Sequence, residues 1–371
     1  MNYTIAILSG DGIGPEVTEQ SCKVLNAIAE CYNHTFTFTK GLVGAVAIDE
    51  TGDPLPEETL RVCHEADAVL FGAIGHPKYD NDPSAKIRPE QGLLKLRKSL
   101  GLFCNIRPVT TYKELVDNSP LKRDIVEGAS FTIYRELTGG IYFGSKELSE
   151  DGQVAVDNCS YSVVEIERIA HLAFKAAQSR NKKLTLVDKA NVLETSRLWR
   201  KTVTNMAAQY PDVFLDFLFV DNAAMQLILN PKQFDVILTE NLFGDIISDE
   251  ASVIGGSIGL LASASVGTHN ALFEPIHGSF PQGAGKDIAN PLASILSVAM
   301  MLEHFGLYEE AEAIQKGVEK SLELGISTED INPNYPFSTS KVGDFIADYI
   351  FNQEDSNINF ANVHMGQSTI I

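Results

Sequence analysis

Short apolar segments alternate with amphipathic segments along almost the whole chain, and this alternation restricts the fold more than any other feature. The short segments are rich in β-branched and aromatic residues, and the longer ones repeat apolar residues with helical spacing. This pattern predicts an α/β architecture. The expected strands are residues 3–8, 35–39, 68–73, 131–134, 184–187, 214–220 and 236–239. The expected helices are residues 15–30, 90–100, 163–179, 194–209, 242–254 and 292–304.

The length of the chain indicates how many domains to expect, and its charge excludes some classes of partner. A chain of 371 residues exceeds the usual size of a single hydrophobic core, so we expect two domains or lobes. Its 29 basic and 49 acidic residues give a net charge of −20, which argues against nucleic acid or an anionic membrane surface as the main partner. A small anionic substrate can bind such an acidic protein only where basic side chains make the local electrostatic potential positive.

The sequence gives three expectations about location and exposed segments. No apolar run is long enough to cross a bilayer, no export signal precedes residues 3–8, and five scattered cysteines suggest a reducing compartment, so we expect a cytoplasmic protein. Residues 151–161 alternate with period two between helical neighbours and suggest a hairpin arm. The polar stretch from Asn352 to Ile371 is expected to be a loosely attached tail.

Asp245 and Asp249 stand one helical turn apart and therefore project from the same face of an expected helix. Two carboxylates held this close repel unless a positive group lies between them. Oxygen ligands with no nearby cysteine or histidine favour Mg²⁺ or Mn²⁺ over zinc. A solvated acidic helix face is the alternative for the pair taken alone.

The turn Gly10-Asp-Gly-Ile-Gly-Pro15 follows a strand and opens a helix, as dinucleotide-binding turns do. It departs from the G-x-G-x-x-G pattern, because Pro15 stands where the third glycine belongs. We therefore expect a loop at a cofactor or substrate cleft and not a Rossmann fold. A tight turn with proline at the first helical position is the alternative.

Three arginines, Arg97, Arg107 and Arg135, lie on or beside expected strands and helices in an otherwise acidic protein. Guanidinium groups bind carboxylates in bidentate fashion, so converging arginines would suit a dicarboxylate substrate. Each arginine alone is as readily a surface or salt-bridged residue. Leu93 and Leu94 are likewise core residues or a specificity pocket.

Lys189 and Asp221 each follow a strand, where functional groups often lie. A lysine beside desolvating walls and other cations can act as a base, although an exposed loop lysine is the alternative. For Asp221 the default role is to cap the following helix. The glycine- and proline-rich segment 274–291 can wrap a nucleotide or serve as a long surface connection.

Together these motifs resemble the isopropylmalate branch of the isocitrate/isopropylmalate dehydrogenases, a family of β-decarboxylating dehydrogenases. The resemblance runs from Gly10 to about Ile350, with the motifs in the family's order. The assignment to the isopropylmalate branch rests mainly on the motif Glu90-x-x-Leu93-Leu94, because isocitrate enzymes carry serine and asparagine in this region.

The resemblance implies a two-lobed fold with a large mixed sheet, distinct from the Rossmann fold. One lobe would comprise residues 1–102 plus 256–371, and a central lobe of residues 103–255 would form a homodimer with shared active sites. The stretch from Gln153 to Tyr161 would be an intersubunit arm.

The resemblance also implies roles for the residues named above. Asp245 and Asp249, with Asp221 from the partner, would bind Mg²⁺ or Mn²⁺. Lys189 would remove the hydroxyl proton of the substrate and Tyr142 would protonate the enolate that decarboxylation leaves. The substrate would be held by Arg97, Arg107, Arg135, Asp221, Leu93, Leu94 and the partner's Val192.

NAD is the implied cofactor, although two positions depart from the family pattern. Gln282 replaces an aspartate that is typical of NAD-dependent members, and His76 replaces a glycine. The lysine-tyrosine pair of NADP-dependent isocitrate enzymes is absent, because Gly283 follows Gln282. The implied cofactor residues are Ile13, His76, Glu90, Asn191, His277, Gly278, Ser279, Gln282, Ala289 and Asn290, within a cleft formed by residues 76–90 and 277–290.

The implied activity is the oxidative decarboxylation of 3-isopropylmalate to 4-methyl-2-oxopentanoate and CO₂ in leucine biosynthesis. The alternatives are a sister enzyme acting on D-malate, tartrate or homoisocitrate, and a non-catalytic regulatory subunit. A regulatory subunit would be expected to lack Lys189, Tyr142 or one of the three aspartates, and the chain carries them all.

Overall fold

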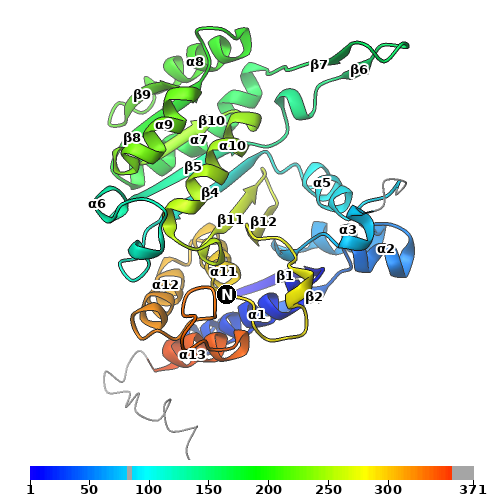
Figure 1. Ribbon diagram of the computed structural model, residues 1–371, viewed down its shortest axis with the longest axis vertical. Coiled ribbons are helices and arrows are strands. Elements are labelled where there is room, and N and C mark those ends of the chain that lie inside the picture. Colours follow the sequence, from blue (N-terminus) through cyan, green and yellow to red (C-terminus); the bar gives the residue numbers. More distant parts are fainter. Residues whose placement is uncertain (82–85, 353–371) are drawn as a thin grey trace, which may run out of the picture.

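The computed structural model describes residues 1–81 and 86–352, in which ten strands form one mixed sheet (Figure 1). The strand order is β2-β1-β3-β12-β11-β4-β5-β10-β8-β9. The strands are β1 (Asn2–Gly10), β2 (Thr35–Lys40), β3 (Ala68–Ala73), β4 (Cys104–Thr110), β5 (Ser130–Glu136), β8 (Lys183–Asp188), β9 (Phe214–Phe219), β10 (Val236–Thr239), β11 (Ala262–Val266) and β12 (Ala271–Pro275). The α/β class with a large mixed sheet is therefore confirmed.

The antiparallel pairing of β11 with β4 is the seam of this sheet, where Ser265 lies opposite Asn105. On one side of the seam lie strands from both ends of the chain, and on the other side lie strands from its middle. The division expected at 102/103 and 255/256 falls on this seam, and we retain it as a proposal.

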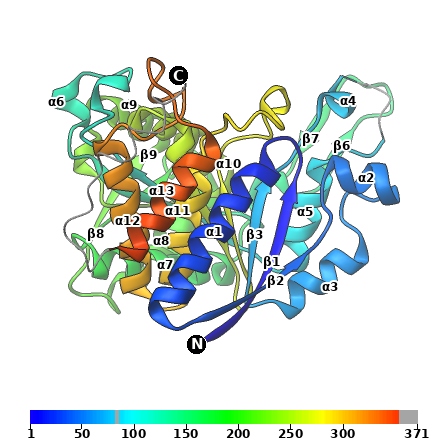
Figure 2. The same cartoon turned by 90° about the horizontal axis from the view of Figure 1, so that it is seen from below.

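Helices cover both faces of the half built from the chain ends. On one face α1 (Gly14–Tyr32), α11 (Leu292–His304), α12 (Tyr308–Glu323) and α13 (Thr339–Phe351) pack side by side (Figure 2). On the other face lie α2 (Ala45–Thr51), α3 (Glu57–Glu65) and α5 (Glu90–Ser99). Because both faces are covered, all six residues of β3 are buried, as is usual for parallel strands of α/β proteins.

The other half of the sheet is enclosed in the same way. The helices α7 (Val163–Ser179) and α8 (Glu194–Ala207) pack on one face, whereas α9 (Val220–Leu229) and α10 (Asn241–Ser252) contribute to a separate hydrophobic cluster. The start of α7 is encoded locally, because the Ser162 hydroxyl accepts from the Glu165 N–H and the Glu165 carboxylate accepts from the Ser162 N–H.

A two-stranded arm extends from the middle of the chain (Figure 1). Its strands β6 (Lys146–Leu148) and β7 (Ala155–Asp157) pair antiparallel, and all six residues are exposed. The expected hairpin is therefore confirmed, whereas its role between subunits stays a proposal.

Several expected elements differ from the structure. The strand expected at 214–220 ends at Phe219, because Val220 begins α9. The helix expected at 242–254 is α10 followed by a separate 3₁₀ turn, Val253–Gly255. The expected elements do not include the strands β4, β11 and β12 or the helices α2, α3, α12 and α13. The expected tail lies, apart from Asn352, outside the described residues, and no helix within the described ranges is long and apolar enough to span a membrane.

We predict that Trp199→Ala will lower the free energy of unfolding by about 3–5 kcal/mol through loss of buried surface and cavity formation. Trp199 is 1% exposed and meets the Tyr161 ring edge-on, with centroids 5.4 Å apart. Urea denaturation followed by far-UV circular dichroism measures the loss. Tyr335→Ala is the control, because Tyr335 is 80% exposed and its truncation should cost little. Equal losses in the two variants would contradict the prediction.

Candidate active site

Adjacent strands bring arginines to the aspartate-bearing helix. Arg107 lies on β4, Arg135 lies on the neighbouring antiparallel strand β5, and both contact α10. Arg107 Nη1 donates to Asp249 Oδ1 at 2.7 Å, and Arg135 Nη1 donates to Asp245. The structure therefore joins the expected carboxylate pair to two of the three expected arginines.

Tyr142 completes this group from a 3₁₀ turn, Gly140–Tyr142, that follows β5. Its hydroxyl donates to Asp245 Oδ2 at 2.8 Å. Burial, with the hydrogen bond to Asp245, raises the pKa of Tyr142 above its ordinary value. Burial lowers the pKa of Arg135 to about 10, even though Asp245 opposes this shift. At neutral pH the tyrosine therefore holds its proton and the arginine its charge.

Arg97, on α5, reaches the same region from the other half of the sheet. Its Nη2 donates to Glu274 Oε1, on β12, at 2.7 Å. One cavity of about 360 Å³ is lined by Leu94, Arg97, Arg135 and Tyr142 together with other residues. A second, of about 170 Å³, is lined in part by Leu93, Arg97, Arg107, His277 and Gly278. Arg97 is thus common to both cavities, and each has one of the two expected leucines in its wall.

Lys189 and Asp221 form a separate pair in the same chain. Lys189 Nζ lies 2.6 Å from Asp221 Oδ1, and this hydrogen bond lowers the pKa of Asp221. The capping role suggested for Asp221 is wrong, because α9 already begins at Val220 and the Asp221 side chain turns to Lys189. Asn191 lines an open cavity on this side, and Val192 is exposed.

One chain does not assemble the three expected metal ligands. Among residues 1–81 and 86–352, no group of three acidic, histidine or cysteine side chains is placed to hold a metal ion. Asp221 of the same chain therefore does not join Asp245 and Asp249 in a three-carboxylate set among these residues.

The turn after β1 contacts the expected cofactor loop directly. The Ile13 N–H donates to the Ser279 carbonyl oxygen at 2.8 Å, and Ile13 packs with Ala289. Gly12 adopts φ +59, and a Cβ there would lie 1.9 Å from Ser279 O. The glycine allows this close approach of two backbones.

His277 opens this loop in a half-buried position. Burial lowers its pKa, and its Nε2 has no hydrogen-bond partner among the described residues. A Cβ added at Gly278 would meet no atom within 4 Å. Asn290, near the end of the loop, uses its side chain internally: Oδ1 accepts from Leu292 N and Nδ2 donates to Asp330. Gln282 lies in the 3₁₀ turn Pro281–Gly283.

Asp11, in the turn between Gly10 and Pro15, organises the other wall of this cleft. The sequence alone did not indicate this role. Its carboxylate accepts from the N–H groups of Ala45, Val46 and Gly75 at 2.9, 3.0 and 2.9 Å. The sequence offers one signal for this role, a polar residue inside a glycine-rich turn. The three N–H groups that Asp11 binds lie far away in the sequence, so the signal does not identify them.

Beside Gly75, two expected cofactor residues take different positions. His76 accepts from Lys78 N and caps the short helix α4 (Pro77–Asp80). The Glu90 carboxylate approaches Gly75, because a Cβ there would lie 3.1 Å from Glu90 Oε1. Residues 82–85 of the expected stretch lie outside the described part.

The side chains present fit both implied groups. Asp245 and Asp249 offer two carboxylates one turn apart beside counter-charges, an oxygen donor set suited to Mg²⁺ or Mn²⁺. The unpartnered buried His277 Nε2, the open space at Gly278 and the glycine contact at Ser279 provide a cleft with polar groups for a dinucleotide.

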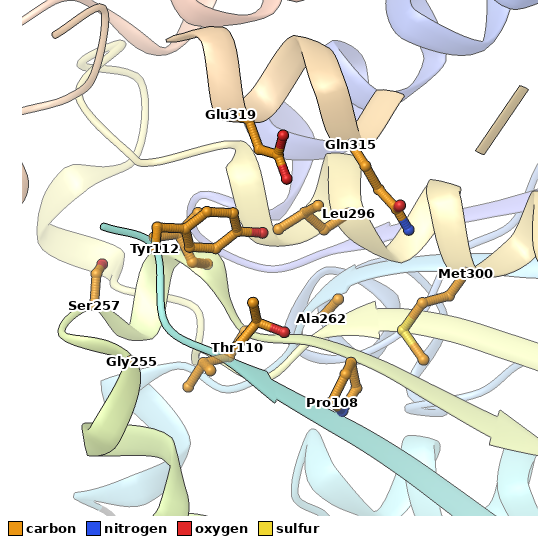
Figure 3. Close-up of a pocket in the computed structure, with 12 residues that line it drawn as sticks. Pro108, Thr110, Tyr112, Gly255, Ser257, Ala262, Leu296, Met300, Gln315 and Glu319 are labelled. Atoms are coloured by element: carbon orange, nitrogen blue, oxygen red, sulfur yellow. The ribbon is translucent and has the colours of Figure 1, made fainter. Parts of the chain in front are cut away.

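Another cavity, of about 190 Å³, lies at the seam and contains none of the expected site residues (Figure 3). It is lined by Pro108 and Thr110 of β4, Ala262 of β11 and residues of α11 and α12. The Glu319 carboxylate lies near the Tyr112 hydroxyl in this view. Burial, with the charge of Glu319, raises the pKa of Tyr112 to about 12. This cavity is therefore separate from the group formed by Arg107, Arg135, Asp245 and Asp249.

Comparisons with known proteins agree on one family. The family model described as isocitrate/isopropylmalate dehydrogenase matches residues 4–346. A 3-isopropylmalate dehydrogenase of Bacteroides fragilis is 55% identical over 352 residues, which is 94% of this chain and 99% of that protein. One of Geobacillus kaustophilus is 56% identical over 338 residues, covering 90% of this chain and 91% of the relative.

Solved structures give the same result for the fold. An isocitrate dehydrogenase of Methylococcus capsulatus has a TM-score of 0.82 at 34% identity, covering 94% of this chain and 99% of that one. A β-decarboxylating dehydrogenase of Thermococcus kodakarensis has a TM-score of 0.80 at 36% identity, covering 95% of this chain and 98% of that one.

We predict that Gly12→Ala will lower the free energy of unfolding by more than Gly52→Ala. Both glycines have positive φ, +59 and +81, so both substitutions carry backbone strain of about 1–3 kcal/mol. Only the alanine at position 12 also meets another backbone, because a Cβ at Gly52 has nothing within 4 Å. Thermal unfolding of the two variants measures the difference. An equal shift would show that the Gly12–Ser279 approach is not close.

Proposed function

Because the chain belongs to the isocitrate/isopropylmalate dehydrogenase family, we propose that it oxidises and decarboxylates 3-isopropylmalate with NAD. The products are 4-methyl-2-oxopentanoate and CO₂, and the reaction serves leucine biosynthesis. The observation that carries this proposal is 55% identity to a 3-isopropylmalate dehydrogenase over 94% of this chain. The chain has the oxidoreductase chemistry of its family, and its substrate is a small molecule.

In the proposed complex, the arginines bind the two carboxylates and the leucines receive the isopropyl group. Arg97, Arg107 and Arg135 supply positive charge within a chain whose net charge is −20. Leu93 and Leu94 line the two cavities that share Arg97. The partner's Val192 would complete the apolar pocket. An apolar wall beside three guanidinium groups suits an alkyl-substituted dicarboxylate.

Asp245 and Asp249 would hold Mg²⁺ or Mn²⁺, with Asp221 of the partner subunit as third ligand. A bound metal would acidify the substrate hydroxyl and offset the negative charge of the later enolate, and bound NAD would supply the hydride acceptor. The cofactor contacts proposed for this chain are Ile13, His76, Glu90, His277, Gly278, Ser279, Gln282, Ala289 and Asn290, with Asn191 contributed by the partner subunit.

Two side chains would move the protons. Lys189, entering from the partner with Asp221, would take the hydroxyl proton as C2 is oxidised. After loss of CO₂, Tyr142 would donate its hydroxyl proton to the enolate carbon. The position of Tyr142 supports the acid role, because its hydroxyl donates to Asp245 Oδ2 at 2.8 Å and so presents a proton beside the proposed metal ligands.

This assignment makes the protein a homodimer with shared active sites. The separation of the Lys189–Asp221 pair from Asp245 and Asp249 in one chain supports it. The exposed Leu148, Val154 and Val156 of the arm support a contact between subunits there. The cytoplasmic location expected from the sequence stays a prediction.

We predict that the purified protein, with 3-isopropylmalate, NAD and Mg²⁺ or Mn²⁺, will produce NADH and CO₂ in equal amounts. NADH absorbance and trapped CO₂ measure the two products. Isocitrate, homoisocitrate, D-malate and tartrate are the comparison substrates. Faster turnover of any of these at equal concentration would transfer the assignment to a sister activity, and no turnover of any would favour the regulatory alternative.

We predict that Lys189→Ala and Asp245→Asn will each abolish turnover and that a mixture of the two will restore it. In a mixed dimer, one site combines the intact Asp245 of one chain with the intact Lys189 of the other. Random pairing should recover about a quarter of wild-type activity, because half of the dimers are mixed and each has one intact site. Co-refolded variants measured by steady-state assay give the result. No recovery, despite mixed dimers seen by native mass spectrometry, would contradict the shared site.

A further inference from the structure

Two of the three substrate arginines are held from behind by buried asparagines. Arg107 Nε donates to Asn105 Oδ1 at 2.8 Å. Arg135 Nε and Nη2 donate to Asn241 Oδ1 at 3.1 and 2.9 Å. Both asparagines are 1% exposed, so these contacts are shielded from water. In each case the Nε edge is fixed while Nη1 faces the aspartates of α10.

The amide nitrogens of these asparagines are fixed in turn. Asn105 Nδ2 donates to Ser263 Oγ at 2.9 Å and to the Ala264 carbonyl oxygen at 3.2 Å, both on β11. Asn241 Nδ2 donates to the Gly139 carbonyl oxygen at 3.1 Å. Arginine can only donate, so the atom facing it must be the amide oxygen, and the network sets the orientation of each amide.

A neutral amide is a specific choice at these positions. It satisfies the guanidinium Nε without cancelling the positive charge, whereas a carboxylate there would neutralise that charge. All three arginines pair with a carboxylate through a terminal nitrogen, but only Arg97 lacks a partner at Nε among the described residues. The asparagines therefore orient Arg107 and Arg135 at the Nε edge without adding a second negative charge beside each guanidinium group.

We propose that Asn105 and Asn241 are positioning residues that direct Arg107 and Arg135 at the carboxylates of the substrate. This inference rests on the proposed function, because it assigns those arginines to a dicarboxylate. Asn241 has a second effect: its bond to Gly139 fixes the turn that carries Tyr142. Asn105 acts on substrate binding, and Asn241 acts on both binding and the protonation step.

The test replaces each asparagine by the isosteric aspartate. N105D should raise the KM for 3-isopropylmalate by about tenfold or more, as expected when a charge-assisted contact is weakened, while the KM for NAD changes little. N241D should raise the same KM and also lower kcat. Each added carboxylate cancels the guanidinium charge and meets the backbone oxygen that the amide had donated to.

N332D is the matched control. Asn332 lies outside the site, where its Nδ2 donates to Gly325 O and its Oδ1 accepts from Tyr335 N. This variant undergoes the same chemical change at a partly buried asparagine and should leave both KM values unaltered. Thermal unfolding reports the folding of every variant. If N105D or N241D does not fold, N105S and N241S remove the carbonyl without adding a charge and should raise the substrate KM in the same direction.

The outcomes separate this inference from the proposed function. Failure of the wild-type protein to turn over 3-isopropylmalate overturns the proposed function. With an active wild type, an unchanged substrate KM in folded N105D and N241D overturns the positioning role. Equal increases in the KM for substrate and NAD would also overturn it, because a general loss of structure acts on both ligands. A rise confined to the substrate supports it.

Discussion

The hydrogen-bonded ladder between β11 and β4 is the contact on which the rest of the structure depends. It is antiparallel, and it joins strands from the chain ends to strands from the middle in one sheet. Asn105 reinforces the ladder through Ser263 and Ala264 of β11 while it holds Arg107. The same backbone pairing that unites the halves therefore sets the position of an arginine in the site.

Charge compensation is the second organising principle of this acidic protein. Each of the three arginines Arg97, Arg107 and Arg135 faces a carboxylate: Glu274 for Arg97, and aspartates of α10 for the other two. Such partly buried pairs cost desolvation energy and do not by themselves stabilise a fold. Their effect is local, because they collect guanidinium and carboxylate groups at one place, which is the arrangement that the proposed function uses.

The sequence allowed the α/β class and the closeness of Asp245 and Asp249 on one helix to be predicted because those signals are local. The helix period of α7 and its capping residues are local, and so is the spacing of Asp245 and Asp249. In contrast, β11 consists mainly of alanine and serine, which are weak strand formers, and all five of its residues are buried. The roles of Asn105 and Asn241 depend on partners brought together only by the sheet. The capping alternative for Asp221 fails because the partner of its side chain, Lys189, lies after another strand and far away in the sequence.

The strand order has a consequence for how the chain is made. Val69 of β3 pairs with Leu272 of β12, so the first strands wait for a partner synthesised much later. The strands from the middle of the chain pair mainly among themselves and can assemble while the C-terminal helices are still on the ribosome. The half that begins first is thus completed last, because the edge of β3 that faces β12 has no partner until the later strand is made. Contacts between residues so distant in sequence slow folding.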